Sequence, residues 1–432
     1  MKSESNHKVS PGDRIKVNFA KYEYEGTLLE SPEEEKNILL LKLDSGYNIG
    51  LNRKEILSVE LLKKASDKKE SEVKKPNSKD KPNIGMIITG GTIASRLDPK
   101  TGAVDSLTKP EDFFKFYPEL FEKVNISRLE IPFMKSSEDM DYKDWQKIAK
   151  SAVELLNDSN IQGIIITHGT DFLHYTSSAL SFFLKDLNKP VVLTYSQRSI
   201  DRASSDANLN LKAAALVAIS DIAEVMLVGH GNSSDEYCLA MPGNKVRKLH
   251  SSKRDAFKVV NCKPYAKIFP NENKIEIISG FRKRNKNKVK LDSGFEEKVA
   301  LLKVYPGQDP SILDFYKKQG YKGIVLEMSG LGHVPTHSRN SWLKKLKEVT
   351  SKGMIVVGTT QTIFGRVDPY VYSNARETLE AGVIYLEDML SETAFVKLGY
   401  VLAKAKNKEE AKRLMLTNMA GEFNDRLEFE GE

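Results

Sequence analysis

The strongest constraint on the fold is a regular alternation of short apolar runs with helical stretches, which begins near residue 83. The apolar runs occupy residues 84–89, 163–167, 191–195, 225–229, 323–328 and 354–359. Helical patterns lie between them at residues 144–156, 206–219 and 341–350. Strands that alternate with helices are typical of a parallel sheet covered by helices. The sequence therefore predicts an α/β core.

A different pattern precedes this core, in residues 1–62. Polar and apolar residues alternate with a period of two in 14–19, and 22–29 and 38–43 behave similarly. The turn Asp44-Ser45-Gly46 leads into a further strand-like run, which is a hairpin signal. Short, closely spaced strands of this kind predict a small all-β module similar to an SH3 barrel.

Residues 63–82 contain eight lysines and four acidic residues, and Val73 is their only sizeable apolar side chain. Such a segment cannot bury enough apolar surface to fold alone, so we interpret it as a flexible charged linker. An RNA-binding tail is the alternative. The segment lacks the interleaved aromatic or arginine side chains that would support it.

A second basic segment, residues 281–290, carries six basic residues and no acidic one. It separates two blocks of the strand–helix alternation, so we place a boundary near 285–298. This division predicts an N-terminal α/β domain at 83–285 and a C-terminal α/β domain at 298–420. We interpret the segment as an exposed linker, with an RNA contact as the alternative.

Composition excludes a wholly disordered, a collagenous and a membrane-embedded protein. The chain of 432 residues is 40% hydrophobic and 29% charged, as in ordinary globular proteins, and its formal charge is +7. The two cysteines, Cys238 and Cys262, cannot form a disulfide framework, which favours a reducing compartment. The longest apolar stretch is interrupted by Asp221 and Glu224. We therefore expect a cytoplasmic protein without a membrane span or signal peptide.

Ligands of open parallel sheets bind beyond the carboxyl ends of the strands, so the residues after each apolar run are candidates for a site. The first run ends in Gly90 and Gly91, which permit a sharp turn and close approach of a ligand. Thr92 follows directly and is a candidate nucleophile. A phosphate-binding loop is excluded, because no Gly-Lys-Ser/Thr follows the glycines. A tight turn without further function is the simpler alternative.

The second run is followed by His168-Gly169-Thr170-Asp171, which begins a helical pattern. A threonine or aspartate at this place can simply cap the helix. Alternatively, Thr170 and Asp171 face the same cleft as Thr92. Two hydroxyls and a carboxylate at neighbouring strand ends suggest a catalytic site more strongly than either segment alone.

Together these segments resemble the paired threonine motifs of the L-asparaginase-like amidohydrolases. Further similarities are the turn that begins at Ser137, the helix start at Asp206, Lys248 ahead of Phe257, and residues 327–335. The resemblance spans roughly 83–420. It implies a two-domain α/β core with parallel sheets, whose larger domain is flavodoxin-like.

The resemblance also implies a mechanism. Thr92 would attack a side-chain amide and form an acyl-enzyme, and Thr170, Lys248 and Asp171 would form a second hydroxyl–amine–carboxylate set. Side chains of further residues would hold the α-amino and α-carboxyl groups of the substrate. Backbone N–H groups could stabilise the oxyanion. The substrate-binding residues implied are Ser137, Glu138, Asp171, Gly91 and Gly169.

The segment after the nucleophile departs from the family pattern. Asparaginases carry a tyrosine in this lid, whereas residues 95–104, which include Asp98 and Thr101, contain none. Two explanations stay open. Either another group, such as Thr101, orients the nucleophile, or the chain acts poorly by itself because its lid is assembled only with a partner.

Other catalytic chemistries are less well supported. Cys238 lacks the glycines of a nucleophile elbow, and His333 and His337 are separated by Pro335, which argues against a helix presenting both to a metal. We therefore expect no metal and no cofactor in this chain.

A barrel, a charged linker and an asparaginase-like core resemble the glutaminase subunits of archaeal tRNA-dependent amidotransferases. That resemblance implies hydrolysis of L-glutamine and delivery of ammonia to a partner, the E-type subunit. The partner would bind Glu-tRNA(Gln), use ATP and Mg²⁺, and form Gln-tRNA(Gln), so the whole complex would be a ligase. It further implies a homodimer of this chain within a heterotetramer.

Two other functions stay open. One is a free-standing cytosolic L-asparaginase with an added module, because pockets discriminate a single methylene only modestly. The other is a non-catalytic scaffold that binds protein or RNA through the barrel and the basic segments. The four intact residues Thr92, Thr170, Asp171 and Lys248 argue against the scaffold.

Overall fold

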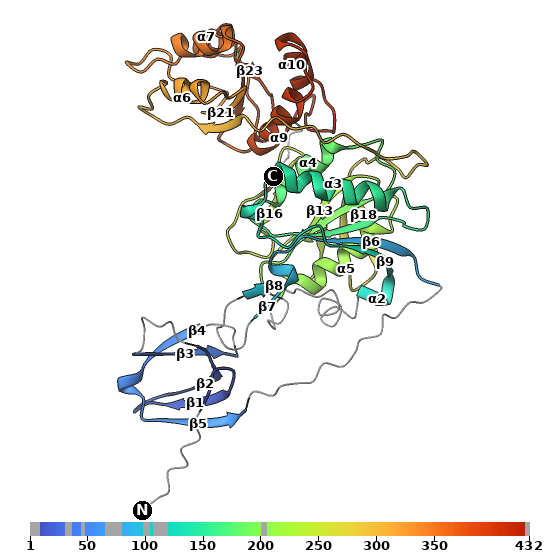
Figure 1. Ribbon diagram of the computed structural model, residues 1–432, viewed down its shortest axis with the longest axis vertical. Helices are drawn as coiled ribbons and strands as arrows, with labels where there is room; N and C mark the ends of the chain where they lie inside the picture. Colours follow the sequence, from blue (N-terminus) through green and yellow to red (C-terminus); the bar gives the residue numbers. More distant parts are fainter. Residues whose placement is uncertain are drawn as a thin grey trace, which may run out of the picture.

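The computed structural model describes residues 9–30, 37–44, 48–64, 80–97, 104–106, 120–199 and 205–427. Figure 1 shows a small all-β unit built from the N-terminal strands, a larger α/β unit and a smaller α/β unit near the C-terminus. Most of the linker predicted at 63–82 lies outside the described residues.

The N-terminal unit is a five-stranded antiparallel sheet in the order β4-β3-β2-β1-β5. Its strands are β1 (Arg14–Asn18), β2 (Glu23–Leu28), β3 (Ile38–Leu43), β4 (Asn48–Asn52) and β5 (Ser58–Lys63). The period of two predicted here is visible in β1, where Ile15 and Val17 are fully buried between partly exposed neighbours. The all-β prediction is confirmed, and β5 is a strand that the sequence pattern did not indicate.

The larger unit contains an eight-stranded sheet in the order β18-β17-β14-β13-β12-β10-β6-β9. Its strands are β6 (Asn83–Ile88), β9 (Asn125–Glu130), β10 (Ile164–Thr167), β12 (Val191–Thr194), β13 (Val225–His230), β14 (Cys238–Pro242), β17 (Ala266–Phe269) and β18 (Lys274–Ile277). Five neighbouring strands of this sheet are parallel, namely β9, β6, β10, β12 and β13. Their order along the chain is 2-1-3-4-5, which is the predicted flavodoxin-like order.

Beyond the predicted parallel strands, β14, β17 and β18 extend this sheet in antiparallel pairing. Only a short connection joins β13 to β14, and a short connection between neighbouring strands forces an antiparallel pair. A small hairpin of β15 (Val246–Lys248) and β16 (Phe257–Val259) is inserted between β14 and β17.

Helices cover both faces of the larger sheet. Consecutive residues of β10 belong to different cores: Ile164 and Ile166 pack with α3 (Tyr142–Leu156) and α4 (Leu173–Phe183), whereas Ile165 packs with α5 (Ala207–Ala218). Because successive side chains of a strand point to opposite faces, a strand buried on both faces is apolar throughout. The short helix α2 (Leu120–Lys123) also lies on the α5 side.

The smaller unit has a four-stranded parallel sheet in the order β20-β21-β22-β23. Its strands are β20 (Val299–Lys303), β21 (Gly323–Met328), β22 (Ile355–Thr360) and β23 (Ile384–Tyr385). Its helices are α6 (Ile312–Lys318), α7 (Leu343–Ser351), α8 (Ser373–Glu380), α9 (Ser391–Leu402) and α10 (Lys408–Met415). The predicted parallel sheet is confirmed.

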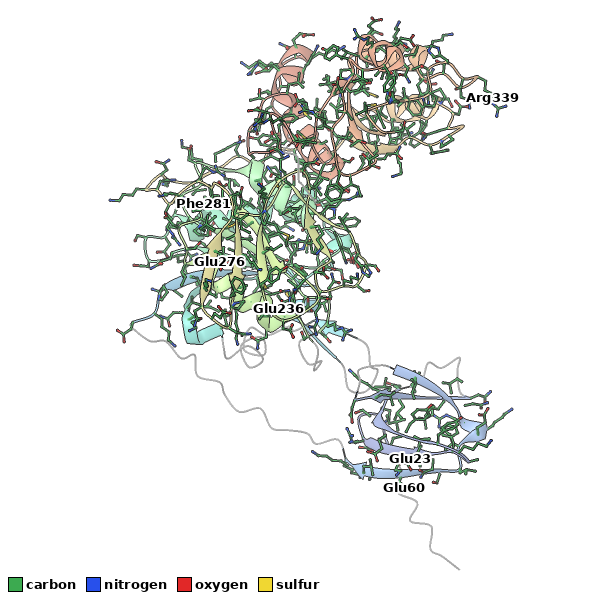
Figure 2. All side chains as sticks on the ribbon, turned by 180° about the vertical axis from the view of Figure 1, so that it is seen from behind. Glu23, Glu60, Glu236, Glu276, Phe281 and Arg339 are labelled. Atoms are coloured by element: carbon green, nitrogen blue, oxygen red, sulfur yellow. The ribbon has the colours of Figure 1, made fainter. Side chains whose placement is uncertain are left out.

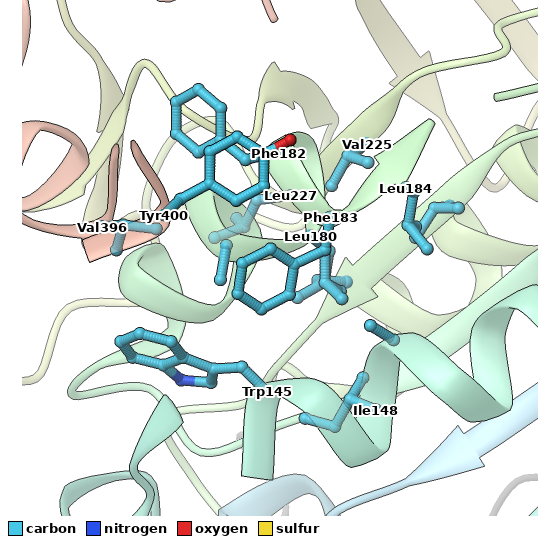
Figure 3. Close-up of a cluster of buried hydrophobic side chains, with 14 of the residues drawn as sticks. Trp145, Ile148, Leu180, Phe182, Phe183, Leu184, Val225, Leu227, Val396 and Tyr400 are labelled. Atoms are coloured by element: carbon cyan, nitrogen blue, oxygen red, sulfur yellow. The ribbon is translucent and has the colours of Figure 1, made fainter. Parts of the chain in front are cut away.

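Helix α9 joins the two α/β units. Its Tyr400 ring stacks on Phe182 of α4, with ring centroids 5.8 Å apart, and Val396 lies in the same buried cluster (Figure 3). This cluster contains side chains from both sheets, so the two units share one hydrophobic core.

The basic segment 281–290 is largely exposed, as a linker would be, but it is held against the larger unit and does not span freely. Arg282 pairs with the buried Glu224, and the Arg284 guanidinium donates to the carbonyls of Ser220 and Ala218. Figure 2 accordingly places Phe281 on the larger unit. The strand β19 (Lys290–Leu291) then pairs with β11 (Leu184–Lys185).

Candidate active site

The loops that follow β6 and β10 contact each other through two glycines. Gly91 has a φ of +80°, and a Cβ atom placed on it would lie 2.4 Å from Cα of Gly169. Neither loop could approach the other so closely with a side chain at position 91. Strands β6 and β10 flank the point where the strand order reverses, which is where α/β folds of this type bind ligands.

Thr92 directly follows this glycine contact. It begins a short 3-10 turn, Thr92–Ala94, in which Ile93 and Ala94 are buried and Thr92 is partly exposed. Thr170 directly follows Gly169 on the other loop. The contact between the glycines therefore places the two threonines on adjoining loops.

Lys248 connects Thr170 and Asp171. Its Nζ lies 2.8 Å from Oγ1 of Thr170 and 2.7 Å from Oδ1 of Asp171. The Lys248 side chain is 9% exposed, whereas the Asp171 side chain is 61% exposed. The Lys248 side chain is thus nearly buried, whereas the Asp171 carboxylate that it contacts remains open to solvent or to a ligand. This arrangement is the hydroxyl–amine–carboxylate set that the resemblance implied.

Ser137 connects a third loop to the same place. Its Oγ accepts hydrogen bonds from the backbone N–H groups of Asp171, at 3.1 Å, and Phe172, at 3.3 Å. A hydroxyl that accepts two bonds retains its own proton for donation to a further group. Glu138 follows in the same short helical turn, Ser137–Asp139, and is exposed. The structure therefore brings together the loops that carry all the expected site residues except those of the lid.

His168 holds the loop after β10 in place through two hydrogen bonds of its ring. Its Nδ1 lies 2.7 Å from the carbonyl of Gly169, and its Nε2 lies 2.9 Å from the hydroxyl of Thr176 on α4. Since a carbonyl can only accept, the proton resides on Nδ1 and the hydroxyl donates to Nε2. Complete burial lowers the pKa of His168 to about 4, against the opposing effect of the Gly169 hydrogen bond. The imidazole is neutral at physiological pH and is a structural support.

A cavity of about 440 Å³ opens beside Lys248. Arg247, Glu392 and His174 are among its lining residues that the sequence did not predict. Arg247 and His174 lie next to motif residues along the chain, and this proximity was the only available signal. Glu392 comes from α9 of the smaller unit, and nothing in its local sequence connects it with the site.

Two other expectations concern residues near the site. Cys238 is buried in β14, and burial raises the pKa of its thiol, which does not suit a nucleophile. The lid residues Asp98 and Thr101 lie outside the described residues.

Among the described residues, no group of three His, Cys, Asp or Glu side chains is arranged to hold a metal ion. No helix in the described ranges is long and apolar enough to cross a membrane.

Comparison with protein families places this fold and site in one class. The family described as "Asparaginase, N-terminal" matches residues 83–281, and the "Glutaminase/Asparaginase C-terminal domain" matches residues 298–415. The class defined by the fold and the site is thus the asparaginase-like amidohydrolases. A third match, the "GatD N-terminal domain", covers residues 9–62, which form the all-β unit.

Similar proteins specify the family further. The D-type subunit of glutamyl-tRNA(Gln) amidotransferase from Thermococcus kodakarensis is 45% identical over 98% of this chain and 97% of its own length. The corresponding subunits of Pyrococcus furiosus and Methanococcus maripaludis are 46% and 43% identical, over 96% and 97% of this chain and 95% and 99% of their own. The chain belongs to the family of D-type glutamyl-tRNA(Gln) amidotransferase subunits.

Solved structures match the core. The thermostable L-asparaginase of Thermococcus kodakarensis superposes with a TM-score of 0.70 at 30% identity, covering 80% of this chain and all of that enzyme. L-asparaginase I of Vibrio cholerae gives a TM-score of 0.67 at 29% identity, over 80% of this chain and 99% of its own.

Proposed function

We propose that this chain is the glutaminase subunit of a tRNA-dependent amidotransferase and hydrolyses the side-chain amide of L-glutamine. The observation that carries the proposal is the position of Lys248 Nζ, within hydrogen-bonding distance of both Thr170 and Asp171. The similarity to D-type amidotransferase subunits over nearly the whole chain supports the same function.

In the proposed reaction, the Thr92 hydroxyl attacks the amide carbon of glutamine. The C–N bond breaks, the leaving nitrogen takes up a proton, and ammonia departs from a glutamyl ester of Thr92. Water then attacks this ester and releases glutamate. Thr170 and Lys248 would move protons during these steps, because the Thr170 loop adjoins the Thr92 loop and Lys248 Nζ lies 2.8 Å from the Thr170 hydroxyl.

The remaining residues have proposed roles in binding. Asp171 and Glu138 carry negative charges at the open side of the site and suit an α-ammonium group, while the Ser137 hydroxyl suits the α-carboxylate. Gly91 and Gly169 offer backbone at close range, where N–H groups could stabilise an oxyanion. Asp98 and Thr101 are proposed to belong to a lid that closes over the substrate.

The ammonia would pass to a partner chain that converts Glu-tRNA(Gln) to Gln-tRNA(Gln). We expect this partner to be the E-type subunit of the amidotransferase. It would hold the ATP and Mg²⁺ that amide synthesis requires, so that this chain acts without a cofactor. The assembly proposed is a homodimer of this chain within a cytoplasmic heterotetramer.

A free-standing L-asparaginase is the second candidate. It is favoured by the similarity of the core to solved L-asparaginases, which it matches over essentially their whole length. Those enzymes cover only 80% of this chain.

Ammonia release from glutamine and from asparagine tests the proposal. The purified chain is assayed alone, then with the partner subunit, ATP, Mg²⁺ and Glu-tRNA(Gln). The proposed function predicts glutamine hydrolysis that rises when the partner and the tRNA are present. Rapid asparagine hydrolysis by the chain alone, unaffected by the partner, would establish the free asparaginase instead.

A further inference from the structure

The strand that carries Lys248 is held in place by the smaller α/β unit. Two contacts secure the turn just before β15. The buried Lys245 ammonium lies 2.8 Å from Oδ2 of the buried Asp388, which precedes α9. The Thr393 hydroxyl, in the first turn of α9, donates to the carbonyl of Asn244 at 2.7 Å. Both contacts cross from one unit to the other.

A third contact lies directly beside the catalytic lysine. Arg247, which immediately precedes Lys248 on β15, places its Nε 2.7 Å from Oε1 of Glu392. The Glu392 side chain is only 6% exposed. We call residues 244–247 and 388–393 together the interdomain clamp. It fixes three of the four residues that lead to Lys248.

His174 fills the space between the clamp and the hairpin. Its Nε2 is 4.0 Å from Oε1 of Glu392, and its ring packs against Phe257, which pairs with Lys248 across the β15–β16 hairpin. Burial, followed by the charges of Arg247 and Lys248, lowers the pKa of His174 to about 3. His174 is therefore neutral, and Arg247 is the cation that pairs with Glu392.

Helix α9 is itself firmly fixed. Tyr400 stacks on Phe182 of α4, and Val396 is fully buried in the shared core (Figure 3). Helix α4 begins directly after Thr170 and Asp171, the two partners of Lys248. The smaller unit thus provides one rigid connection from the helix that carries the partners to the strand that carries the lysine.

We infer that the interdomain clamp positions Lys248, with Glu392 and Thr393 of the smaller unit acting through Arg247 and Asn244 to hold the ammonium against Thr170. This positioning role rests on the proposed function for its catalytic consequence. Misplacement of a reacting group by about 1 Å can cost up to about a hundredfold in rate.

The test uses Arg247→Gln, Glu392→Gln and the double variant in the full chain with its partner subunit. Each single variant is expected to lower kcat for glutamine about tenfold. KM is expected to stay within about twofold, because the bond from the Asp171 backbone N–H to Ser137 Oγ joins these two binding residues independently of β15. The double variant is expected to be no slower than either single one, since all three break the same contact.

Glu224→Gln is the matched control. It replaces a buried carboxylate that also pairs with an arginine, Arg282, but lies just before β13, at the opposite end of the sheet from the site. Its kcat is expected to equal that of the wild type even where its stability falls. Thr393→Val supplies a further variant of nearly unchanged volume, with an expected few-fold loss of kcat.

Amide hydrogen exchange over residues 245–249 measures the positioning independently of catalysis. Exchange there is expected to accelerate about tenfold in Glu392→Gln and Thr393→Val, while β10 keeps its protection. Unchanged exchange, unchanged kcat in the clamp variants, or losses that multiply in the double variant would each overturn the clamp. If the wild-type complex does not hydrolyse glutamine, the proposed function fails, and the exchange measurement still decides whether the clamp holds the strand.

Discussion

At the scale of single residues, Lys248 and Thr92 divide the proposed chemistry between them. Thr92→Ala removes the nucleophile and is expected to lower glutamine hydrolysis more than about a thousandfold. Lys248→Met keeps the length of the side chain but removes its proton-carrying group, with an expected loss of about 10²–10⁴-fold. Ammonia release by each variant, measured with the partner present, checks both values. Hydrolysis at the wild-type rate by Thr92→Ala would show that another group is the nucleophile.

His168 predicts a dependence of stability on pH. Its pKa in the folded chain is about 4, below the value near 6.5 that is usual for unfolded chains. Between these values the unfolded state binds the proton and the folded state does not. The part of the stability that depends on His168 should therefore be fully present above about pH 6.5 and decrease by about 1.4 kcal/mol per pH unit as the pH falls towards 4.

Urea unfolding of the wild type and His168→Asn between pH 7 and pH 4.5 measures this contribution. On acidification, the free energy of unfolding of the variant should decrease less steeply than that of the wild type, by about 1.4 kcal/mol per pH unit, which is the contribution of one proton. His174→Gln should behave in the same way, because burial lowers the pKa of His174 to about 3. Equal slopes in the wild type and both variants would contradict the neutral, buried state of these histidines.

At the scale of elements, the contact between the loops after β6 and β10 depends on Gly91. Gly91→Ala introduces a Cβ 2.4 Å from Gly169, whereas Gly307→Ala has the same φ of +80° and no atom within 4 Å. Both variants bear the strain of a left-handed alanine, about 1–2 kcal/mol. Only Gly91→Ala should also lose glutamine hydrolysis, by at least about a hundredfold, because the two threonine loops must separate. Unfolding free energies and kcat/KM of the two variants give the comparison, and equal activities would contradict it.

Elements also differ in how far the sequence predicts them. Strands β6, β10, β12 and β13 are buried on both faces, so their continuous apolar runs are distinctive and their ends locate Thr92 and Thr170. The hairpin strand β15, Val-Arg-Lys, has only three residues and no apolar period. Lys248 is found only by resemblance, because no local pattern indicates a strand there.

The clamp is beyond sequence reasoning for a different reason. Its two halves lie far apart in the chain, and Glu392 belongs to a helix whose pattern indicates only packing. The contact arises from the tertiary arrangement of the two α/β units. The same reason explains why the prediction of an exposed linker at 281–290 does not include its contact with the larger unit, since Glu224, the partner of Arg282, belongs to a distant part of the chain.

At the scale of the whole molecule, the two α/β units should unfold as one, because they share a buried core. Leu398 of α9 is fully buried in that core. Leu398→Ala should destabilise the chain by about 2–5 kcal/mol and accelerate amide exchange equally in β10 and β21. The control Leu416→Ala alters a side chain that is 46% exposed and should have little effect. Faster exchange in β21 alone would show that the units are energetically independent.

We propose that ammonia released from glutamine at Thr92 reaches the glutamyl group that is linked to the tRNA. The most direct test supplies glutamine labelled with ¹⁵N at its side-chain amide to the complex with the partner subunit, ATP, Mg²⁺ and Glu-tRNA(Gln). We expect ¹⁵N in the Gln-tRNA(Gln) formed by the wild type and none with Thr92→Ala, which labelled ammonium should rescue. Label transfer from glutamine by Thr92→Ala, or no label transfer by the wild type, would contradict the proposed delivery of ammonia from Thr92 to the tRNA.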